Sequence, residues 1–324
     1  MAKRSLSEQL DEAVAAVLAH PEAPLPRVNP RVAPLVRFAA DLRDLPSEDF
    51  KARLKADLKR RGSMTTTGVK PIREGFHTIT PYLIGPGAAE LIEFLKQAFG
   101  AIEVFRAKRP DGAIMHAEVR INDSMIEMGD ATAQYPPVPA AIHLYVEDVD
   151  AVYSRALQAG ATSMQEPVDQ PYGDREAGVK DSSGNHWYIA THRGARHVPE
   201  GLRSVTPYLH PRGAAQLIDF LKKAFGAEEA FRAESPEDTI VHAKVKIGDS
   251  ILEMGEAHGE YQPMPCVLHL YVNDTDALYA RALRAGATSL LEPRDEPYGD
   301  RCAGVKDPFG NQWFIATHIK DVPM

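Results

Sequence analysis

Three short segments place histidine and carboxylate side chains where they could act together. His116 lies in AIMHAEVRI, Glu127 in SMIEMGD and His143 in AIHLYV. Imidazole and carboxylate groups can hold Zn²⁺, Fe²⁺ or Mn²⁺, and they also form hydrogen bonds to small polar molecules. A single histidine on a strand face is more often a hydrogen-bonded binding residue than a metal ligand. We therefore expect ligand binding first, with no cofactor firmly implied and a divalent metal as the alternative.

The same residue types return later in the chain and widen the set of candidates. His242, Glu253 and His269 repeat the first three, and Glu127, His143, Glu253 and His269 are the best metal candidates. The other candidates for ligand binding are Tyr145, Arg175, Tyr188, Tyr271, Arg301 and His318. In the two PYGDR segments, the arginines could clamp a carboxylate or phosphonate. The favoured alternative is that each pairs with the neighbouring aspartate and pins the loop against the next strand.

These candidates recur because the chain contains a tandem repeat. Residues 78–192 and 204–318 align without a gap at a shift of 126 residues, and 71 of the 115 aligned positions are identical. At this identity most residues are shared whatever their role, so the return of a histidine is weak evidence of function. With the preceding region, the repeat predicts three parts: a helical extension and linker over 1–75, and two domains over 76–196 and 197–324.

Each repeat predicts two β-α-β-β-β units. Amphipathic helices alternate with short strands, and Asp111-Gly112 marks one of the turns. In AIMHAEVRI, the alternation predicts an apolar face of Met115, Ala117, Val119 and Ile121, with His116 and Glu118 on the opposite face. The same parity puts Trp187 and Trp313 on the helix side of their strands. One sheet face should therefore pack against helices and the other should be polar.

The first 75 residues have a different pattern. We expect helices over 5–19 and 35–43, a proline-rich connector over 20–34, and a third helix after Ser47. The third helix ends in a basic run that includes Lys55 and Arg61. Nucleic-acid binding is one interpretation of that run, and a solvated helix face is the commoner one.

Composition limits the classes of partner. The chain has 37 basic and 45 acidic residues and a net charge of −8, which argues against nucleic acid or an anionic membrane surface as the partner. No apolar run is long enough to span a bilayer, so we expect a cytoplasmic protein with a small-molecule partner. The two cysteines, Cys266 and Cys302, have no counterparts in the first repeat, so we expect free thiols.

The segments HLYVEDVDA, EPVDQPYGDR and DPFGNQW resemble the vicinal oxygen chelate superfamily, which includes glyoxalases, bleomycin-resistance proteins and extradiol dioxygenases, and most closely its PhnB-like branch. The resemblance covers about 78–318. It implies an α+β fold of tandem glyoxalase-like domains, in which each pair of β-α-β-β-β units curls a mixed sheet into a U around a ligand cavity.

The resemblance also implies a four-ligand metal site on the first, fourth, fifth and last strands of a pair of units. Within the first repeat these positions fall on Thr80 (or near Thr78), Glu127, Ala141 and Tyr188. In the second they fall on Thr206, Glu253, Val267 and Phe314. Only the glutamates are ligand types, although His143 could replace the missing fifth-strand ligand.

Three functions remain open at this point. The first is a metal-free protein that binds a small polar or anionic organic molecule. The second is a metal-dependent lyase, isomerase or dioxygenase that uses Glu127 with His143 and Glu253 with His269. The third is a scaffold whose N-terminal helices bind a protein partner. Because relatives often build the cavity across a dimer interface, we expect this tandem chain to be a monomer that forms the pseudo-dimer internally.

Overall fold

The structure is a computed structural model that describes residues 12–17, 26, 28–29, 32–33, 36, 69–259 and 261–322. Its contacts divide the chain into two compact units, Met1–Gly68 and Val69–Met324. In the first unit, residues 12–17 are helical, within the helix predicted for 5–19. Most of the predicted helix over 35–43, the predicted helix after Ser47 and its basic run lie outside the described residues. No described helix is long and apolar enough to cross a membrane.

Residues 79–318 fold as four β-α-β-β-β units, as the periodicity predicts. The first unit contains β1 (Ile79–Gly85), α4 (Ala88–Phe99), β2 (Ile102–Lys108), β3 (Ile114–Ile121) and β4 (Ser124–Asp130). The second contains β5 (Ala141–Tyr145), α5 (Val149–Gln158), β6 (Thr162–Asp169), β7 (Asp174–Lys180) and β8 (His186–His192). The third contains β9 (Val205–Leu209), α6 (Ala214–Phe225), β10 (Glu228–Glu234), β11 (Ile240–Ile247) and β12 (Ser250–Met254). The fourth contains β13 (Val267–Tyr271), α7 (Thr275–Arg284), β14 (Thr288–Asp295), β15 (Asp300–Lys306) and β16 (Gln312–His318).

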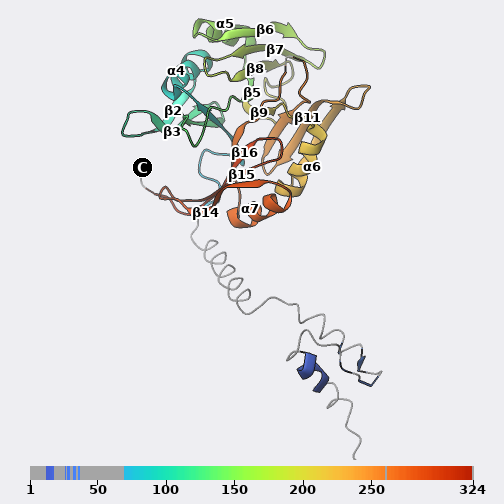
Figure 1. The fold of residues 1–324 in the computed structure, drawn as a ribbon. Helices are drawn as coiled ribbons and strands as arrows, with labels where there is room; N and C mark the ends of the chain where they lie inside the picture. Colours follow the sequence, from blue (N-terminus) through green and yellow to red (C-terminus); the bar gives the residue numbers. More distant parts are fainter. Residues whose placement is uncertain are drawn as a thin grey trace, which may run out of the picture. The chain divides into compact units, whose positions relative to one another are not determined.

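Each sheet takes one unit from each repeat (Figure 1). Sheet A has the strand order β14-β15-β16-β13-β1-β4-β3-β2 and joins the first unit to the fourth. Sheet B has the order β10-β11-β12-β9-β5-β8-β7-β6 and joins the second unit to the third. The expectation that the two units of one repeat share a sheet is therefore wrong. The repeats form a pseudo-dimer within one chain. That residues 76–196 and 197–324 are independent domains stays a prediction.

The repeats meet at two antiparallel strand pairs. In sheet A, β1 pairs with β13 and Thr80 lies opposite His269. In sheet B, β5 pairs with β9 and Thr206 lies opposite His143. The two joints have the same register, because a shift of 126 residues converts one set of partners into the other. This register brings a histidine of each repeat next to strands of the other repeat.

The strand alternation separates the apolar core from the polar faces, as predicted. Trp187 and Trp313 are fully buried in the core, where they contact Phe99 and Phe225 with ring centroids 4.8 and 4.7 Å apart. Met115 is the exception, because 58% of its surface is exposed. It is the extra residue of a bulge where β2 and β3 shift register, which turns its side chain away from the core.

Aspartates at the β3–β4 and β11–β12 turns fasten one repeat to the start of the other. Oδ1 of Asp249 accepts a hydrogen bond from the Thr78 backbone N–H at 2.8 Å, and its Oδ2 lies 3.0 Å from both His77 Nδ1 and Arg203 Nη2. Burial raises the pKa of Asp249, but the bond from Thr78 and the neighbouring donors outweigh burial and hold it well below its usual range. The carboxylate therefore stays charged at the joint.

We expect Asp249→Ala to lower the free energy of unfolding by about 1–2 kcal/mol at pH 7, since it removes charge-assisted hydrogen bonds at a partly exposed site. Urea unfolding followed by circular dichroism measures this. The depressed pKa means that the contribution of Asp249 is present above its unfolded pKa and fades as the pH falls through the folded value. The two proteins should therefore converge in acid, and a difference that grows in acid would contradict this role.

Candidate functional site

The polar face of sheet A carries a buried pair formed by Glu127 on β4 and His269 on β13. Nδ1 of His269 lies 2.7 Å from Oε2 of Glu127. Both side chains are buried, and Nε2 of His269 has no hydrogen-bond partner among the described residues. The pair is a contact between the repeats, since Glu127 belongs to the first repeat and His269 to the second.

Polar side chains continue from His269 along the same face. The His269 ring stacks on Tyr271 with centroids 4.5 Å apart. The Tyr271 hydroxyl donates to Asp300 at 2.9 Å, and the other oxygen of Asp300 lies 2.6 Å from Nδ1 of His318. Burial and the nearby carboxylates raise the pKa of Tyr271, so its hydroxyl remains a donor.

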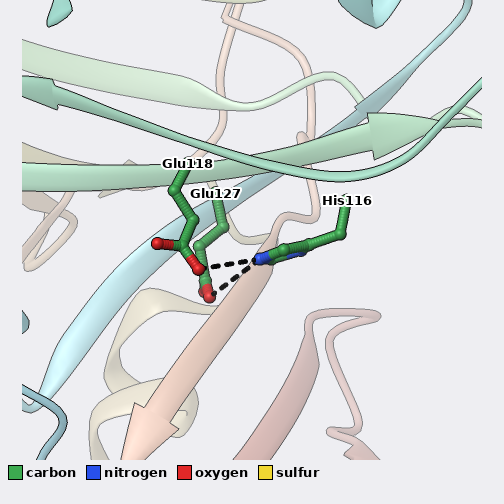
Figure 2. Close-up of side chains that lie close together, drawn as sticks. All are labelled: His116, Glu118 and Glu127. Carbon is green, nitrogen blue, oxygen red and sulfur yellow. Dashed lines mark hydrogen bonds and ion pairs between the residues drawn. The ribbon is translucent and has the colours of Figure 1, made fainter. Parts of the chain in front are cut away.

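On the other side of Glu127, His116 points toward two carboxylates (Figure 2). Nε2 of His116 lies 3.1 Å from Oε1 of Glu118 and 3.9 Å from Oε1 of Glu127. The Tyr82 hydroxyl lies 3.1 Å from Nδ1 of the same ring. Arg73 forms an ion pair with Glu118. Burial raises the pKa of Glu118, but the bonds from His116 and Arg73 outweigh burial and lower it, so the carboxylate is charged.

The segment before β1 covers this face of sheet A. The His318 N–H donates to the carbonyl of Pro71 at 2.9 Å, and the Phe76 ring packs edge-on against Tyr271 with centroids 5.6 Å apart. The Arg73 guanidinium lies 4.1 Å above the Phe76 ring. The chain that leads into the first repeat is therefore part of the sheet A site.

Sheet B carries the matching pair of Glu253 on β12 and His143 on β5. Nδ1 of His143 lies 2.6 Å from Oε2 of Glu253, and its ring packs on Tyr145 with centroids 4.4 Å apart. The Tyr145 hydroxyl donates to Asp174 at 3.0 Å. Nε2 of His143 also has no hydrogen-bond partner in the described chain, and its nearest charged neighbour is Oε1 of Glu176 at 3.9 Å.

The charges around His143 favour the imidazolium form. Burial lowers the pKa of His143, but the charge and hydrogen bond of Glu253 outweigh burial and raise it. Burial raises the pKa of Glu253, but His143 outweighs it and the result lies well below the usual value. Burial also raises the pKa of Glu176. The pair is a buried ion pair whose histidine directs one N–H away from its partner.

His210, which directly follows β9 of sheet B, lies beside several aromatic rings. Nε2 of His210 lies 2.8 Å from the Tyr188 hydroxyl, and the His210 ring packs on Tyr208 with centroids 4.8 Å apart. Burial, followed by nearby His186, lowers the pKa of His210 to about 4. His210 is therefore neutral near pH 7, and its Nε2 shares a hydrogen bond with the Tyr188 hydroxyl.

The two sites differ at a few positions that decide their charge. Lys244 replaces Glu118, and its Nζ lies 3.3 Å from Oε1 of Glu253. Pro199 replaces Arg73 in the segment before the strand, and Glu176 replaces Cys302. Beside its glutamate, sheet A thus has the carboxylate of Glu118 and an arginine from the preceding segment, whereas sheet B has a lysine on the neighbouring strand and the carboxyl of Glu176.

The structure brings most predicted site residues together, but the glutamates and histidines that contact each other are not the predicted pairs. Glu127 meets His269, and Glu253 meets His143, so the predicted sets of Glu127 with His143 and Glu253 with His269 are wrong. The reason is the exchange of units between sheets. The remaining candidates lie beside these pairs on the same faces: His116, Tyr271 and His318 in sheet A, and Tyr145, Tyr188 and His242 in sheet B.

The two PYGDR arginines are engaged in structural ion pairs. Arg175 donates to Asp150 at 2.7 Å and to Asp169 at 2.9 Å, which ties β7 to α5 and β6. Arg301 pairs with Asp276 and Asp295 in the same way. These contacts favour a structural role over the carboxylate clamp. The partners are not the neighbouring Asp174 and Asp300, which accept hydrogen bonds from Tyr145 and Tyr271.

Sequence reasoning missed Arg73, Glu118 and Lys244 as site residues. Glu118 and Lys244 could have been found, because they follow His116 and His242 by two residues and so share their strand face. Arg73 lies in a linker without periodicity, so nothing in the sequence marks its contact with Glu118.

A small hollow between β1 and β9 is separate from both sites. Its lining is nearly symmetric and includes Thr80 and Thr206, with Pro81 and Pro207. The hollow encloses about 20 Å³, which suits roughly one water molecule. It belongs to the joint between the repeats and is too small for an organic ligand.

The four metal-ligand positions implied by the resemblance do not fit a metal in either sheet. In sheet A they are Thr80, Glu127, Val267 and Phe314, and in sheet B they are Thr206, Glu253, Ala141 and Tyr188. Phenylalanine, valine and alanine side chains have no donor atom, so each sheet has a glutamate without the usual partners.

Comparison with protein families gives two matches to one model. The model of the Glyoxalase/Bleomycin resistance protein/Dioxygenase superfamily matches residues 75–189 and 212–315. Among curated relatives, "Uncharacterized protein MT0910" of Mycobacterium tuberculosis (strain CDC 1551 / Oshkosh) is 36% identical over 142 residues, which are 40% of this chain and 80% of that protein. "Putative glyoxylase CFP32" of Mycobacterium bovis (strain ATCC BAA-935 / AF2122/97) is 26% identical over 198 residues, 56% of this chain and 74% of that protein.

Among solved structures, glyoxalase I from Zea mays superposes with a TM-score of 0.57 at 15% identity, covering 74% of this chain and 92% of that one. At that identity the likeness shows the fold alone.

Proposed function

Since the chain belongs to the Glyoxalase/Bleomycin resistance protein/Dioxygenase superfamily, we propose that it binds a small polar or anionic organic molecule at the glutamate–histidine pair of each sheet. We also assign it to the PhnB-like branch, on the HLYVEDVDA and EPVDQPYGDR segments. The binding does not use the superfamily's metal tetrad, whose positions lack donors here.

One observation carries this proposal: Nε2 of His143 and Nε2 of His269 are buried and have no hydrogen-bond partner in the part of the chain that is described. Leaving such a group unsatisfied costs about 1–3 kcal/mol, so native proteins rarely do so without a reason. The glutamate fixes the ring through Nδ1, and the tyrosine packed against the ring restricts its rotation. A ligand oxygen at Nε2 would complete the bonding.

The charge of the sheet B pair favours an anionic oxygen there. The raised pKa of His143 makes Nε2–H a charged donor over a wider pH range than an ordinary histidine. Lys244 adds a second cation on the far side of Glu253. The Glu176 carboxyl lies 3.9 Å from Nε2, and burial raises its pKa, which favours the uncharged form next to a bound anion. A small organic acid therefore fits this site better than an alcohol or amide of the same shape.

The test is a thermal-shift screen of small organic acids against their neutral amides, followed by calorimetry on any hit. At least one acid should raise the melting temperature of the full chain. We expect the affinity to fall by roughly tenfold or more in the double variant His143→Gln/His269→Gln, since a hydrogen bond to a charged group contributes about 1.5–3 kcal/mol.

The chain offers a matched control in His186, because the second repeat has Gln312 at that position. His186→Gln makes the same chemical change outside the pairs and should keep the binding. A screen without any acid-specific shift, or a shift that survives in the double variant, contradicts the proposal.

A second candidate function is a metal-dependent lyase, isomerase or dioxygenase. The grouping of His116, Glu118 and Glu127 favours it, because these side chains offer three ligand atoms close together. The third candidate, a scaffold whose N-terminal helices bind a protein, concerns residues mostly outside the described chain and stays a prediction.

A further inference from the structure

We propose that sheet A has a site for one divalent transition-metal ion, held by His116, Glu118 and Glu127, and that sheet B has no such site. Two of these ligands lie on β3, outside the strand positions of the superfamily's tetrad. The site is distinct from the histidine Nε2 atoms that carry the proposed function, and metal binding by itself does not depend on that function.

The ligand atoms have a suitable arrangement. One atom from each of the three side chains lies within 4.8 Å of the other two. The separations from His116 Nε2 are 3.1 Å to Glu118 and 3.9 Å to Glu127. These values bracket the edge of about 3.4 Å expected for a tetrahedron with metal–ligand bonds of about 2.1 Å. One imidazole and two carboxylates suit Zn²⁺, Mn²⁺ or Fe²⁺.

The surrounding residues orient the ligands toward one point. Tyr82 holds Nδ1 of His116, which leaves Nε2 directed at the carboxylates (Figure 2). His269 holds Oε2 of Glu127, which leaves Oε1 on the side of His116. Partners of this kind, bonded to the second atom of each ligand, fix ring and carboxylate orientation in metal sites.

The two facing carboxylates attract positive charge to this position. Glu118 and Glu127 lie directly opposite each other on the antiparallel strands β3 and β4, and both are almost fully buried. Like charges placed this way destabilise a sheet unless a positive charge lies between or beside them. The Arg73 guanidinium supplies that charge, but it comes from the segment before β1 and a quarter of its side chain is exposed. A metal ion would compete with it for Glu118.

The second repeat shows how the same need is met without a metal. Lys244 stands in place of Glu118, and its Nζ lies 3.3 Å from Oε1 of Glu253. Pro199 stands in place of Arg73, so no arginine is supplied from that segment. Lysine removes one carboxylate ligand and adds a fixed cation, so a metal ion would be repelled.

The experiment titrates the chelator-treated full chain with Zn²⁺ and, separately, Mn²⁺, by calorimetry and by equilibrium dialysis with elemental analysis. We expect one equivalent per chain for the wild type. Glu118→Lys, which copies the second repeat, should lose it, and Lys244→Glu should bring the total toward two. Arg73→Gln should bind the metal several-fold more tightly because the competing cation is gone.

The repeats supply a matched pair of histidine variants. His116→Gln should lose the metal, whereas His242→Gln should keep one equivalent. Circular dichroism shows whether each variant is folded. Lys244→Glu tests the position equivalent to Glu118 by a gain of metal binding, which a misfolded protein would not produce. A wild type that binds no equivalent, or one equivalent that survives Glu118→Lys, overturns the proposal. Because only metal is added, these outcomes are separate from the organic-acid screen.

Discussion

Residues 69–196, produced without the rest of the chain, are expected to form a homodimer and no stable monomer. In the full chain, β1 and β5 each pair with a strand of the second repeat. Without that repeat, each would present an open edge next to buried core residues, which favours pairing with another chain.

The homodimer is expected because the two joints are equivalent. Ile79 pairs with Leu270 in sheet A, and Leu144 pairs with Val205 in sheet B. A shift of 126 residues places Leu270 on Leu144 and Val205 on Ile79, so the first repeat contains both halves of the joint. Two copies can therefore pair β1 with β5 twice. In that dimer Glu127 of one copy would meet His143 of the other.

Light scattering coupled to gel filtration measures this directly, with twice the fragment mass expected. The unfolding midpoint of the fragment should rise with its concentration, since folding and association are linked. The full chain is the control, because its joints lie within one molecule and its midpoint should not change with concentration. A folded fragment of single mass would show that one repeat closes its own sheet.

The same equivalence explains what the sequence could and could not predict. Alternation along β5 and β8 identifies their core and polar faces, and the structure agrees for Trp187 and His143. Pairing between units is a different problem. Because the repeats share 71 of 115 positions, Glu127 could meet His143 or His269 with nearly the same local contacts. Only the path of the whole chain decides between them.

The residues that were predicted wrongly have local causes. Met115 does not lie on the predicted apolar face, because one extra residue in β3 forms a bulge that the alternation pattern does not reveal. Arg73 reaches Glu118 from a segment that has no periodic pattern. By contrast, Glu118 lies on the predicted polar face, but on β3, which is not one of the strands that carry the superfamily's tetrad.

Glu253→Gln is expected to destabilise the protein by about 3–5 kcal/mol near pH 6, the usual effect of removing one partner from a buried ion pair. Glu253 and His143 are both buried, and their atoms lie 2.6 Å apart. The variant would leave the His143 imidazolium and the Lys244 ammonium next to a neutral amide. His143 could then escape the penalty only by losing its proton.

The loss of unfolding free energy in Glu253→Gln should depend on pH, because the pKa values of His143 and Glu253 both shift on folding. The folded pKa of His143 is raised, so its contribution is fully present below the unfolded pKa of about 6.5 and is lost as the pH rises through the folded value. The folded pKa of Glu253 is lowered, so its contribution is present above the unfolded pKa of about 4.3 and is lost as the pH falls through the folded value. The pair therefore stabilises most between about pH 4.3 and 6.5.

Other groups that face His143 act in the same direction. Glu176 and Asp174 on β7 both raise its pKa, and Glu176 lies 3.9 Å from Nε2. They remain in the Glu253→Gln variant, so His143 should keep part of its charge at low pH. Because these two carboxyl groups still compensate the His143 imidazolium, the loss of unfolding free energy in Glu253→Gln should be smaller than for a buried ion with no partner.

Urea unfolding of both proteins from pH 5 to pH 9 measures the difference, and NMR of the imidazole protons follows His143 itself. The wild type should lose its advantage as His143 deprotonates, and the His143 pKa should fall in the variant. Glu228→Gln makes the same change at an exposed position on β10 and should cost little at any pH. If the difference between wild type and Glu253→Gln stays constant from pH 5 to pH 9, the buried pair is not ionised, and the charged-donor argument for an organic acid at Nε2 would fail with it.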